Sequence, residues 1–290
     1  MSVDQDLQEV FDADVLPSAA RIRLWMATQY GEAVTASVMR QFSDDRTQHG
    51  GLRLSSLGKP AVLQAIEIPT VKAELVDAGL YVTEQISMRM RELFHRGDQY
   101  EAFVLCVLQM SGWTIETTQQ TVEFLGVTGH TDAVVVSPTG ERVLLEVKTM
   151  SDTYYKAFTK RQNDDRGYIT QLATYTHCVG LPSLWLCFNK STHDVAIIKP
   201  VLSQFTEALA RAATIIPLLT ERINCFDDVG KHLSPPPPVP EVYRKHQTGR
   251  SLLHPSIKYS QHRHLFYNIL VEDNGYGKPT EYVTGYSQTL

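Results

Sequence analysis

The sequence has little cysteine, and none of it is arranged to bind metal. Its four cysteines, Cys106, Cys178, Cys187 and Cys225, lie far apart in 290 residues, and no two form a C-x-x-C pair. This spacing excludes a zinc finger and a small domain held together by disulfides. We expect reduced thiols that pack as small apolar side chains.

Long apolar runs are absent as well. No stretch reaches the ~18 residues that a membrane-spanning helix needs, which excludes a membrane protein of that kind. The chain does not begin with a basic segment followed by an apolar one, the pattern of a secretory signal peptide. With 43% hydrophobic and 20% charged residues, the composition is that of an ordinary globular protein. We expect a cytoplasmic location.

The chain also lacks an overall excess of basic residues, since its net charge is -5. Five acidic residues between positions 4 and 14 precede the first basic residue, Arg21, so the remainder of the chain sums to zero. From Lys231 onward, seven Lys and Arg outnumber four acidic residues. Such a segment either contacts phosphates or is merely solvated. Charge therefore does not exclude a polyanionic partner.

Glycine, proline and apolar periodicity divide the chain into three predicted regions. Residues 1–90 are expected to form a helical N-terminal region, with an amphipathic stretch near 18–40. Residues 91–225 are expected to form the core. Residues 226–290 contain a stiff linker at Pro235–Pro240, followed by a C-terminal segment.

The core pattern predicts an α/β fold, a central mixed β-sheet flanked by helices. A helix is expected over about 85–110, and four strands after it form an antiparallel meander. Two more strands and two helices complete the core. The predicted strands are 113–117, 121–125, 130–137, 142–148, 184–188 and 195–198, and the later helices are 167–179 and 201–224.

Two carboxylates face each other in one predicted hairpin. If Ser137 pairs with Glu141 across a three-residue turn, Asp132 lies opposite Glu146, with about 4.5 to 5.5 Å between Cβ atoms. Such carboxylates repel unless a cation lies between them, and Mg²⁺ with ligands at about 2.0 to 2.1 Å fits the gap. Strand alternation places Lys148 on the face of Glu146, where its ammonium could act on a water or a phosphate.

Two pairs of residues at helical spacing accompany this hairpin. Gly97 and Glu101 share one helix face, where the glycine would let another backbone or a phosphate approach and Glu101 would add a third carboxylate. Gln171 and Tyr175 share a face of the later helix. Alone, each pair is weak, because a helical Glu is most often a solvated surface group and a Q-x-x-x-Y pair is usually structural.

Taken together, these motifs resemble the RecB-like branch of the PD-(D/E)XK nucleases. They span about residues 91–200, and the chain most resembles phage-encoded exonucleases of the lambda-exonuclease-like type. A shorter segment, 53–60, is similar to one that such proteins carry before the core. The motifs are Gly97-x-x-x-Glu101, Gly129-His130-x-Asp132, Glu146-Val147-Lys148 and Gln171-x-x-x-Tyr175.

The resemblance implies a restriction-endonuclease-like core with a metal-dependent site. One or two Mg²⁺ or Mn²⁺ ions would be bound by Glu101, Asp132, Glu146 and the carbonyl of Val147. Many relatives also hold an iron–sulfur cluster through one early and three late cysteines. The C-terminal segment 257–264 has no cysteine, so we expect no cluster. The implied catalytic residues are Asp132, Glu146, Lys148, Glu101, Gln171 and Tyr175.

The implied activity is a DNA exonuclease that acts from ends in recombination, repair or replication of a phage or mobile genome. Its partner would be DNA, as linear duplex or single strand, in the host cytoplasm if the protein is phage-encoded. A single-strand annealing or recombination protein and a homo-oligomer stay open as further partners. Two alternatives also stay open: a structure-selective or restriction-type endonuclease on the same core, and a non-catalytic DNA-binding protein.

A basic stretch with two tyrosines follows the last of these strands. Tyr154, Tyr155, Lys156, Lys160, Arg161 and Arg166 are expected to lie in a loop. Such a loop either follows a DNA strand by stacking and phosphate contacts or is merely solvated.

Overall fold

The computed structural model divides the chain into two compact units. One comprises described residues of Met1–His49, Ile86–Asp164 and Leu172–Ala208, and the other those of Gly50–Gln85, Asp165–Gln171 and Leu209–Leu290. The predicted amphipathic stretch near 18–40 and the proline-rich linker lie outside the described residues, and the predicted region boundaries stay predictions. The described residues are 3–12, 51–59, 61–66, 68–79, 81, 88–161, 164, 166–224, 243–245, 251–253, 263, 267–272 and 280–286.

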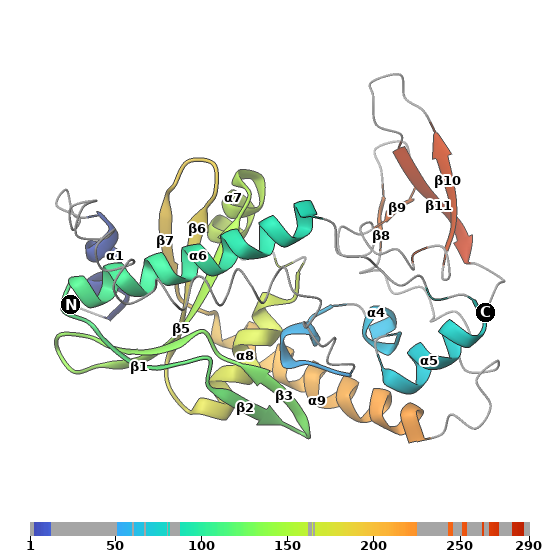
Figure 1. The fold of residues 1–290 in the computed structure, drawn as a ribbon, viewed down its shortest axis with the longest axis horizontal. Coiled ribbons are helices and arrows are strands. Elements are labelled where there is room, and N and C mark those ends of the chain that lie inside the picture. Colours follow the sequence, from blue (N-terminus) through green and yellow to red (C-terminus); the bar gives the residue numbers. More distant parts are fainter. Residues whose placement is uncertain are drawn as a thin grey trace. The chain divides into compact units, whose positions relative to one another are not determined.

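The first unit is built on a five-stranded mixed sheet with the strand order β1-β4-β5-β6-β7 (Figure 1). Strands β5 and β6 are parallel, and every other neighbouring pair is antiparallel. This confirms the predicted central mixed sheet. The strands are β1 (Thr114–Thr118), β4 (Ala133–Val136), β5 (Arg142–Met150), β6 (Ser183–Asn189) and β7 (Val195–Ile198).

The register of β4 and β5 is the predicted one. The Ser137 N–H donates to the Glu141 carbonyl at 2.8 Å across the turn, and Ala133 pairs with Leu145 at the far end. One further step along this register places Asp132 opposite Glu146.

The predicted meander is wrong, because β1 pairs with β4 and the segment between them forms a hairpin of its own. This hairpin consists of β2 (Thr121–Phe124) and β3 (Val127–His130). Its two-residue turn, Leu125-Gly126, has φ angles of 50° and 79°. Two successive positive φ angles are the mark of the type I′ turn that closes tight hairpins. The predicted strand 130–137 is therefore two strands, separated at Thr131 and Asp132.

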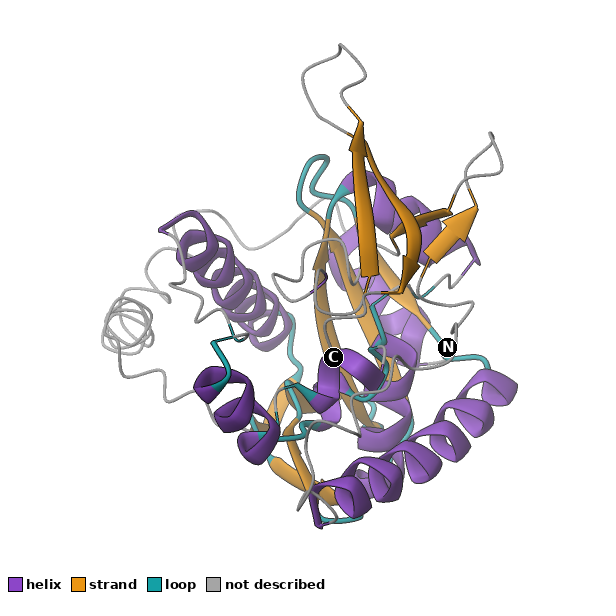
Figure 2. Cartoon of the chain, turned by 90° about the vertical axis from the view of Figure 1, so that its right-hand side faces the viewer, coloured by secondary structure: helices purple, strands orange, loops and turns teal. Residues whose placement is uncertain are grey.

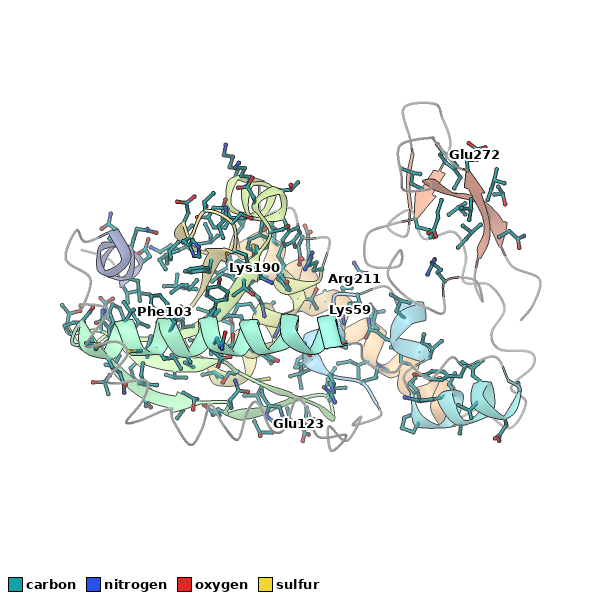
Figure 3. All side chains as sticks on the ribbon, turned by 45° about the horizontal axis from the view of Figure 1, so that its top comes forward. Lys59, Phe103, Glu123, Lys190, Arg211 and Glu272 are labelled. Carbon is teal, nitrogen blue, oxygen red and sulfur yellow. The ribbon has the colours of Figure 1, made fainter. Side chains whose placement is uncertain are left out.

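Helices cover both faces of this sheet. Helix α6 (Met88–Met110) lies along one face of the sheet (Figure 1). Its buried Leu105 and Leu108 belong to the same core cluster as Leu145 and Val147 of β5. On the same face, Tyr100 and Phe103 of α6 contact Phe188, with ring centroids 4.5 and 6.5 Å away. Figure 3 labels Phe103 on this helix.

The opposite face is centred on the buried indole of Trp185. Phe158 of α7 (Asp152–Arg161) and Phe205 of α9 (Leu202–Asn224) meet this ring edge-on, with centroids 5.3 and 5.9 Å away. Because Glu146 pairs with Trp185 in the parallel register, Glu146 belongs to this face. The predicted separation of Glu146 and Lys148 from the Leu145 and Val147 layer is thereby confirmed.

Helix α1 (Val3–Asp12) lies against the edge strand β7. The Gln8 side-chain amide donates to the Val195 carbonyl at 3.3 Å and accepts from the Ile197 N–H at 3.0 Å. A side-chain amide thus bonds to the strand as a neighbouring peptide group would, and it satisfies backbone groups that an edge strand otherwise exposes.

The predicted loop after β5 is wrong over 152–161, where the chain forms α7. Asp152 in the first turn suits the positive end of the helix dipole, and its carboxylate pairs with Lys156 one turn later at 2.7 Å. Phe158 supplies the buried contact that holds this polar helix on the sheet. Helix α8 (Tyr168–Val179) then leads into β6.

The second unit contains short helices and a C-terminal sheet. The helices are η1 (Leu54–Ser56), α4 (Ala61–Ala65) and α5 (Pro69–Asp77). The C-terminal strands pair in the order β10-β11-β9-β8 as an antiparallel sheet (Figure 2), where sequence analysis expected no strands. They are β8 (Tyr243–Lys245), β9 (Ser251–Leu253), β10 (Tyr267–Glu272) and β11 (Thr280–Tyr286).

Two glycines allow a close backbone approach in this second unit. A Cβ added to Gly58 would lie 2.2 Å from the Gly167 Cα, a distance that no side chain tolerates. The backbone at Gly58 therefore packs directly on Gly167, the residue that precedes α8.

The thiols largely follow expectation. Cys106 and Cys187 are buried and free, and burial raises the pKa of Cys106 and raises that of Cys187 to about 12. Cys178 is only partly buried, and Cys225 lies outside the described residues. Within the described ranges, no helix is both long and apolar enough to cross a membrane.

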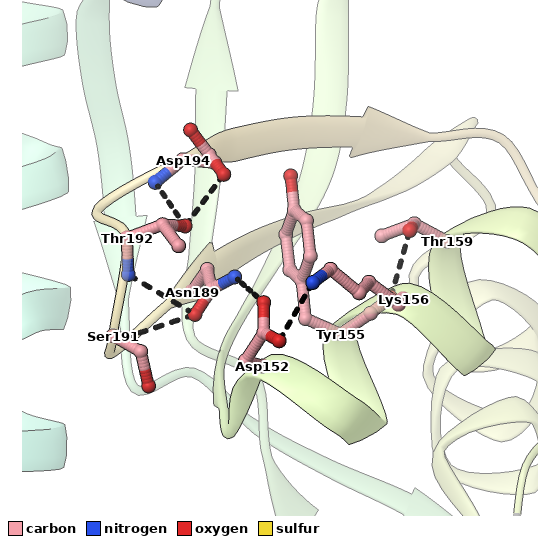
Figure 4. A network of polar contacts seen from close by, with 8 residues as sticks. All are labelled: Asp152, Tyr155, Lys156, Thr159, Asn189, Ser191, Thr192 and Asp194. Carbon is pink, nitrogen blue, oxygen red and sulfur yellow. Dashed lines mark hydrogen bonds and ion pairs between the residues drawn. The ribbon is translucent and has the colours of Figure 1, made fainter.

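A buried asparagine ties the turn between β6 and β7 to the start of α7 (Figure 4). Asn189 is fully buried, and its Nδ2 donates to the Asp152 carboxylate at 3.0 Å. Its Oδ1 accepts from the backbone N–H groups of Ser191 and Thr192 at 3.0 and 3.4 Å. One amide thus fixes the point where α7 departs from the sheet.

Replacing this amide should destabilise the protein. We expect Asn189→Ala to lower the free energy of unfolding by about 2 to 3 kcal/mol, because it leaves buried polar groups without their partner. Urea denaturation followed by circular dichroism measures the change. The control is Ser191→Ala, which removes an exposed hydroxyl from the same turn and should have little effect. Equal stability of the two variants would contradict the assigned role of Asn189.

Candidate active site

Asp132 lies directly before β4, which begins at Ala133. Its Oδ2 accepts a hydrogen bond from the Val147 N–H at 2.8 Å. If the β4–β5 ladder continued without interruption, the alternation of hydrogen-bonded pairs that starts at Ser137 and Glu141 would pair Val147 with Thr131. The Val147 N–H would then donate to the Thr131 carbonyl. The Thr131 N–H instead donates to the Gln120 carbonyl at 3.0 Å, so this residue follows the β2–β3 hairpin. The Asp132 carboxylate takes the place of the missing backbone acceptor.

Glu146 and Lys148 form a close ion pair on one face of β5. The Lys148 Nζ lies 2.6 Å from the Glu146 Oε1. The Glu146 side chain is fully buried, whereas that of Lys148 is 15% exposed. An ammonium at this position can reach both the buried carboxylate and whatever approaches from solvent.

Electrostatics show how closely these groups interact. Burial, followed by the negative charge of Asp132, raises the pKa of Glu146 to about 8, although the charge of Lys148 and its hydrogen bond oppose this. Burial also raises the pKa of Asp132, against the charge of Lys148 and the hydrogen bond from Val147. The raised pKa values mean that a negative charge on both carboxyl groups at once is unfavourable. A cation between the two groups would offset this repulsion.

Glu101 joins the site from the other side of the sheet. It projects from α6, and its charge makes a small additional contribution that raises the pKa of Glu146. Its Oε1 accepts from the Gln119 Nε2 at 3.0 Å. The Gln119 N–H donates to the Asp132 carbonyl at 3.2 Å. Sequence analysis did not single out Gln119, and no motif marks it.

The space beside Gly97 is open. A Cβ added there would meet nothing within 4 Å among the described residues outside its own helix. The approach of another backbone or of a phosphate to this glycine therefore stays a prediction.

Gln171 and Tyr175 lie one turn apart on α8, as predicted, and both side chains are buried. Their roles in catalysis stay predictions. His130, at the end of β3, is exposed, and its Nδ1 lies 3.2 Å from the Thr121 Oγ1, a contact that suits a role within the hairpin.

The donor set suits a hard divalent cation. Mg²⁺ is commonly held by one or two carboxylates together with waters and substrate phosphates, and Asp132 and Glu146 provide such a pair. Within the described ranges, no group of three or more His, Cys, Asp or Glu side chains is gathered closely enough to hold a metal by itself. Glu101 is therefore not grouped with this pair closely enough to make a three-residue metal site, and its role as a ligand stays a prediction.

Comparisons with known proteins give only distant likenesses. No protein-family model and no curated protein matches the sequence. Similar solved structures include an alkaline exonuclease from Laribacter hongkongensis, at 17% identity and a TM-score of 0.42 over 64% of this chain and 96% of that one. Its complex with dAMP gives a TM-score of 0.41 at the same identity and coverage. A phage-related exonuclease from Haemophilus somnus matches at 13% identity, with a TM-score of 0.32 over 60% and 96% of the two chains.

The raised pKa of Glu146 predicts how stability depends on pH in the absence of divalent cations. The folded protein keeps this proton until a pH of about 8, whereas an unfolded chain releases it near 4.5, so the free energy of unfolding falls across this window. Glu146→Gln carries no such charge. In EDTA, we expect the melting temperature of the wild type to fall more steeply from pH 5.5 to 8.5 than that of the variant.

The matched control for this comparison is Glu116→Gln. Glu116 is a surface carboxylate on β1, and its hydrogen bond with Arg142 lowers its pKa, so its ionisation is constant over this range. Its pH profile should parallel the wild type. Parallel profiles for the wild type and Glu146→Gln would contradict the assignment.

Proposed function

We propose that the protein is a metal-dependent DNA exonuclease of the PD-(D/E)XK class, which hydrolyses phosphodiester bonds from DNA ends. The observation that carries the proposal is the opposition of Asp132 and Glu146 with Lys148 beside them. The two carboxylates provide oxygen ligands for a metal ion, and the Lys148 ammonium provides a positive charge for a phosphate. These are the two requirements of phosphodiester hydrolysis. Its role would lie in recombination, repair or replication of a phage or mobile genome, as the motif resemblance implies.

The residues of β5 would share the binding of Mg²⁺ or Mn²⁺ with Asp132. Glu146 would contribute its carboxylate, and Val147 its carbonyl. In a strand, the N–H and carbonyl of one residue face the same neighbour, so the carbonyl of Val147 is directed toward the side on which its N–H meets Asp132. The ion, when bound, polarises a phosphoryl oxygen and lowers the pKa of a coordinated water.

Lys148 would act on the water or on the phosphate. Its ammonium already lies against Glu146, and its partly exposed position lets it exchange this contact for one with a phosphate oxygen. There it would orient the attacking water or offset the charge that develops in the transition state. Glu101 would add a third carboxylate, and Gln171 and Tyr175 would position the scissile phosphate and Lys148.

Helix α7 offers a surface along which DNA could lie. It begins directly after β5, the strand that carries Lys148, and its exposed face includes Lys156 and Lys160. Contacts from such groups would bind phosphates without reading the sequence, as suits an enzyme that follows a strand from its end.

Substitution of the central residues should remove activity without unfolding the protein. We expect Asp132→Ala, Glu146→Ala and Lys148→Ala each to lower kcat/KM on end-labelled linear DNA by orders of magnitude, because each group acts at the reacting phosphate. Glu101→Ala should be severe as well. EDTA should abolish wild-type activity, and Glu116→Ala, which removes a surface carboxylate, should stay near wild type. Activity of Glu146→Ala within about tenfold of wild type would show the site to be wrongly assigned.

Digestion should depend on a DNA end. The sequence has no zinc-finger or helix-turn-helix signature that could read a DNA sequence, so cleavage should begin where a strand end enters the site. A time course compares supercoiled plasmid with the same plasmid linearised, at equal Mg²⁺. The linear form should be degraded progressively while closed circles survive. Discrete fragments from the circle, produced as fast as the linear form disappears, would favour the endonuclease alternative.

A further inference from the structure

Gln119 contacts two residues of the candidate site, the carboxylate of Glu101 and the backbone of Asp132. Its side chain donates from Nε2 to the Glu101 Oε1 at 3.0 Å, and its backbone N–H donates to the Asp132 carbonyl at 3.2 Å. Glu101 lies on α6, whereas Asp132 directly precedes β4. A single residue therefore links groups that belong to separate elements.

The backbone of Gln119 is in an unusual conformation. Its φ angle is 51°, in the left-handed region that side-chain-bearing residues rarely adopt. Glycine would adopt this angle more readily, but it would bring no amide to Glu101. Residues held in sparsely populated conformations cluster at functional sites, where the surrounding structure maintains them.

The place of this residue in the fold explains the conformation. After β1 the chain leaves the central sheet, and the N–H and carbonyl groups of Gln119 and Gln120 meet those of Thr131 and Asp132 as the hairpin begins. At this point the pairing of β1 with β4 changes to the pairing of β2 with β3, and Asp132 lies outside the regular ladder. The same change in backbone direction frees the Asp132 side chain and directs the Gln119 side chain toward Glu101.

The contact with Glu101 contributes little to stability. It is exposed to solvent, and exposed hydrogen bonds exchange readily with water, so its net contribution to the free energy of unfolding is small. It does restrict the carboxylate, because the amide that holds Glu101 is itself anchored to Asp132 through the backbone.

We propose that Gln119 is a positioning residue, which holds the carboxylate of Glu101 at the Asp132–Glu146 pair so that it can take part in metal-dependent hydrolysis. This inference rests on the proposed nuclease function. Gln119 touches neither the metal nor the DNA, and it acts through Glu101 alone.

The test is Gln119→Gly, which keeps the backbone N–H, relieves the positive φ angle and removes only the amide. The control is Leu125→Gly, at the tip of the same hairpin, where an exposed residue has a φ angle of 50°. Both variants should melt at or slightly above the wild-type temperature. Gln119→Gly should raise the Mn²⁺ concentration for half-maximal activity and lower kcat, by about tenfold together. Leu125→Gly should keep wild-type values for both.

A double-mutant cycle tests whether Gln119 affects activity through Glu101. If Gln119 acts through Glu101, then Gln119→Gly should cost nothing further in a Glu101→Gln background. Additive losses would overturn the positioning role, as would Gln119→Gly with a kcat and a Mn²⁺ requirement within twofold of wild type.

Calorimetric titration with Mn²⁺ alone separates this inference from the proposed function. An inactive wild type on every DNA substrate would overturn the nuclease assignment, and the calorimetric arm would still decide on Gln119. Weaker Mn²⁺ binding by Gln119→Gly than by Leu125→Gly would support its role at Glu101. Equal binding by the two variants would overturn it.

Discussion

The hydrogen bond from the Val147 N–H to the Asp132 carboxylate is the interaction on which the candidate site depends. It satisfies a backbone donor of β5 that the ladder with β4 leaves without an acceptor. The bond restrains the Asp132 side chain opposite Glu146, so the two carboxylates keep the spacing of the ladder although Asp132 precedes the first residue of β4.

This arrangement is unfavourable for the protein by itself. Glu146 is fully buried, its neighbour on β6 is the large apolar ring of Trp185, and the negative charge of Asp132 acts on it. Lys148 offsets only part of this, since the pKa of Glu146 stays raised despite its presence. Pairs of titratable groups with such strongly perturbed behaviour are typical of functional sites. Additional positive charge would relieve the strain, which is why a divalent cation suits this pair.

The parts of the fold that sequence predicted are those that local rules determine. The turn after Ser137 and the strand alternation were sufficient for the β4–β5 register, and hence for Asp132 opposite Glu146. The neighbouring hairpin was missed because its turn begins at Leu125, an apolar residue in an unusual conformation that continued the strand pattern. Helix α7 was missed because Phe158 is its one fully buried apolar side chain, too little to form a helical period.

Gln119 could not be found from sequence at all, since its role exists only where β1 and β4 give way to the hairpin. In an unbroken sheet, α6 would lie on one face and the Glu146 side chain on the other, with backbone between them. Because β4 begins only at Ala133, after Asp132, the charge of Glu101 reaches Glu146 past the end of the strand. The interruption of the ladder before β4 thus both frees the Asp132 side chain and brings the charge of Glu101 to bear on Glu146, although residues 101 and 146 are far apart in the sequence.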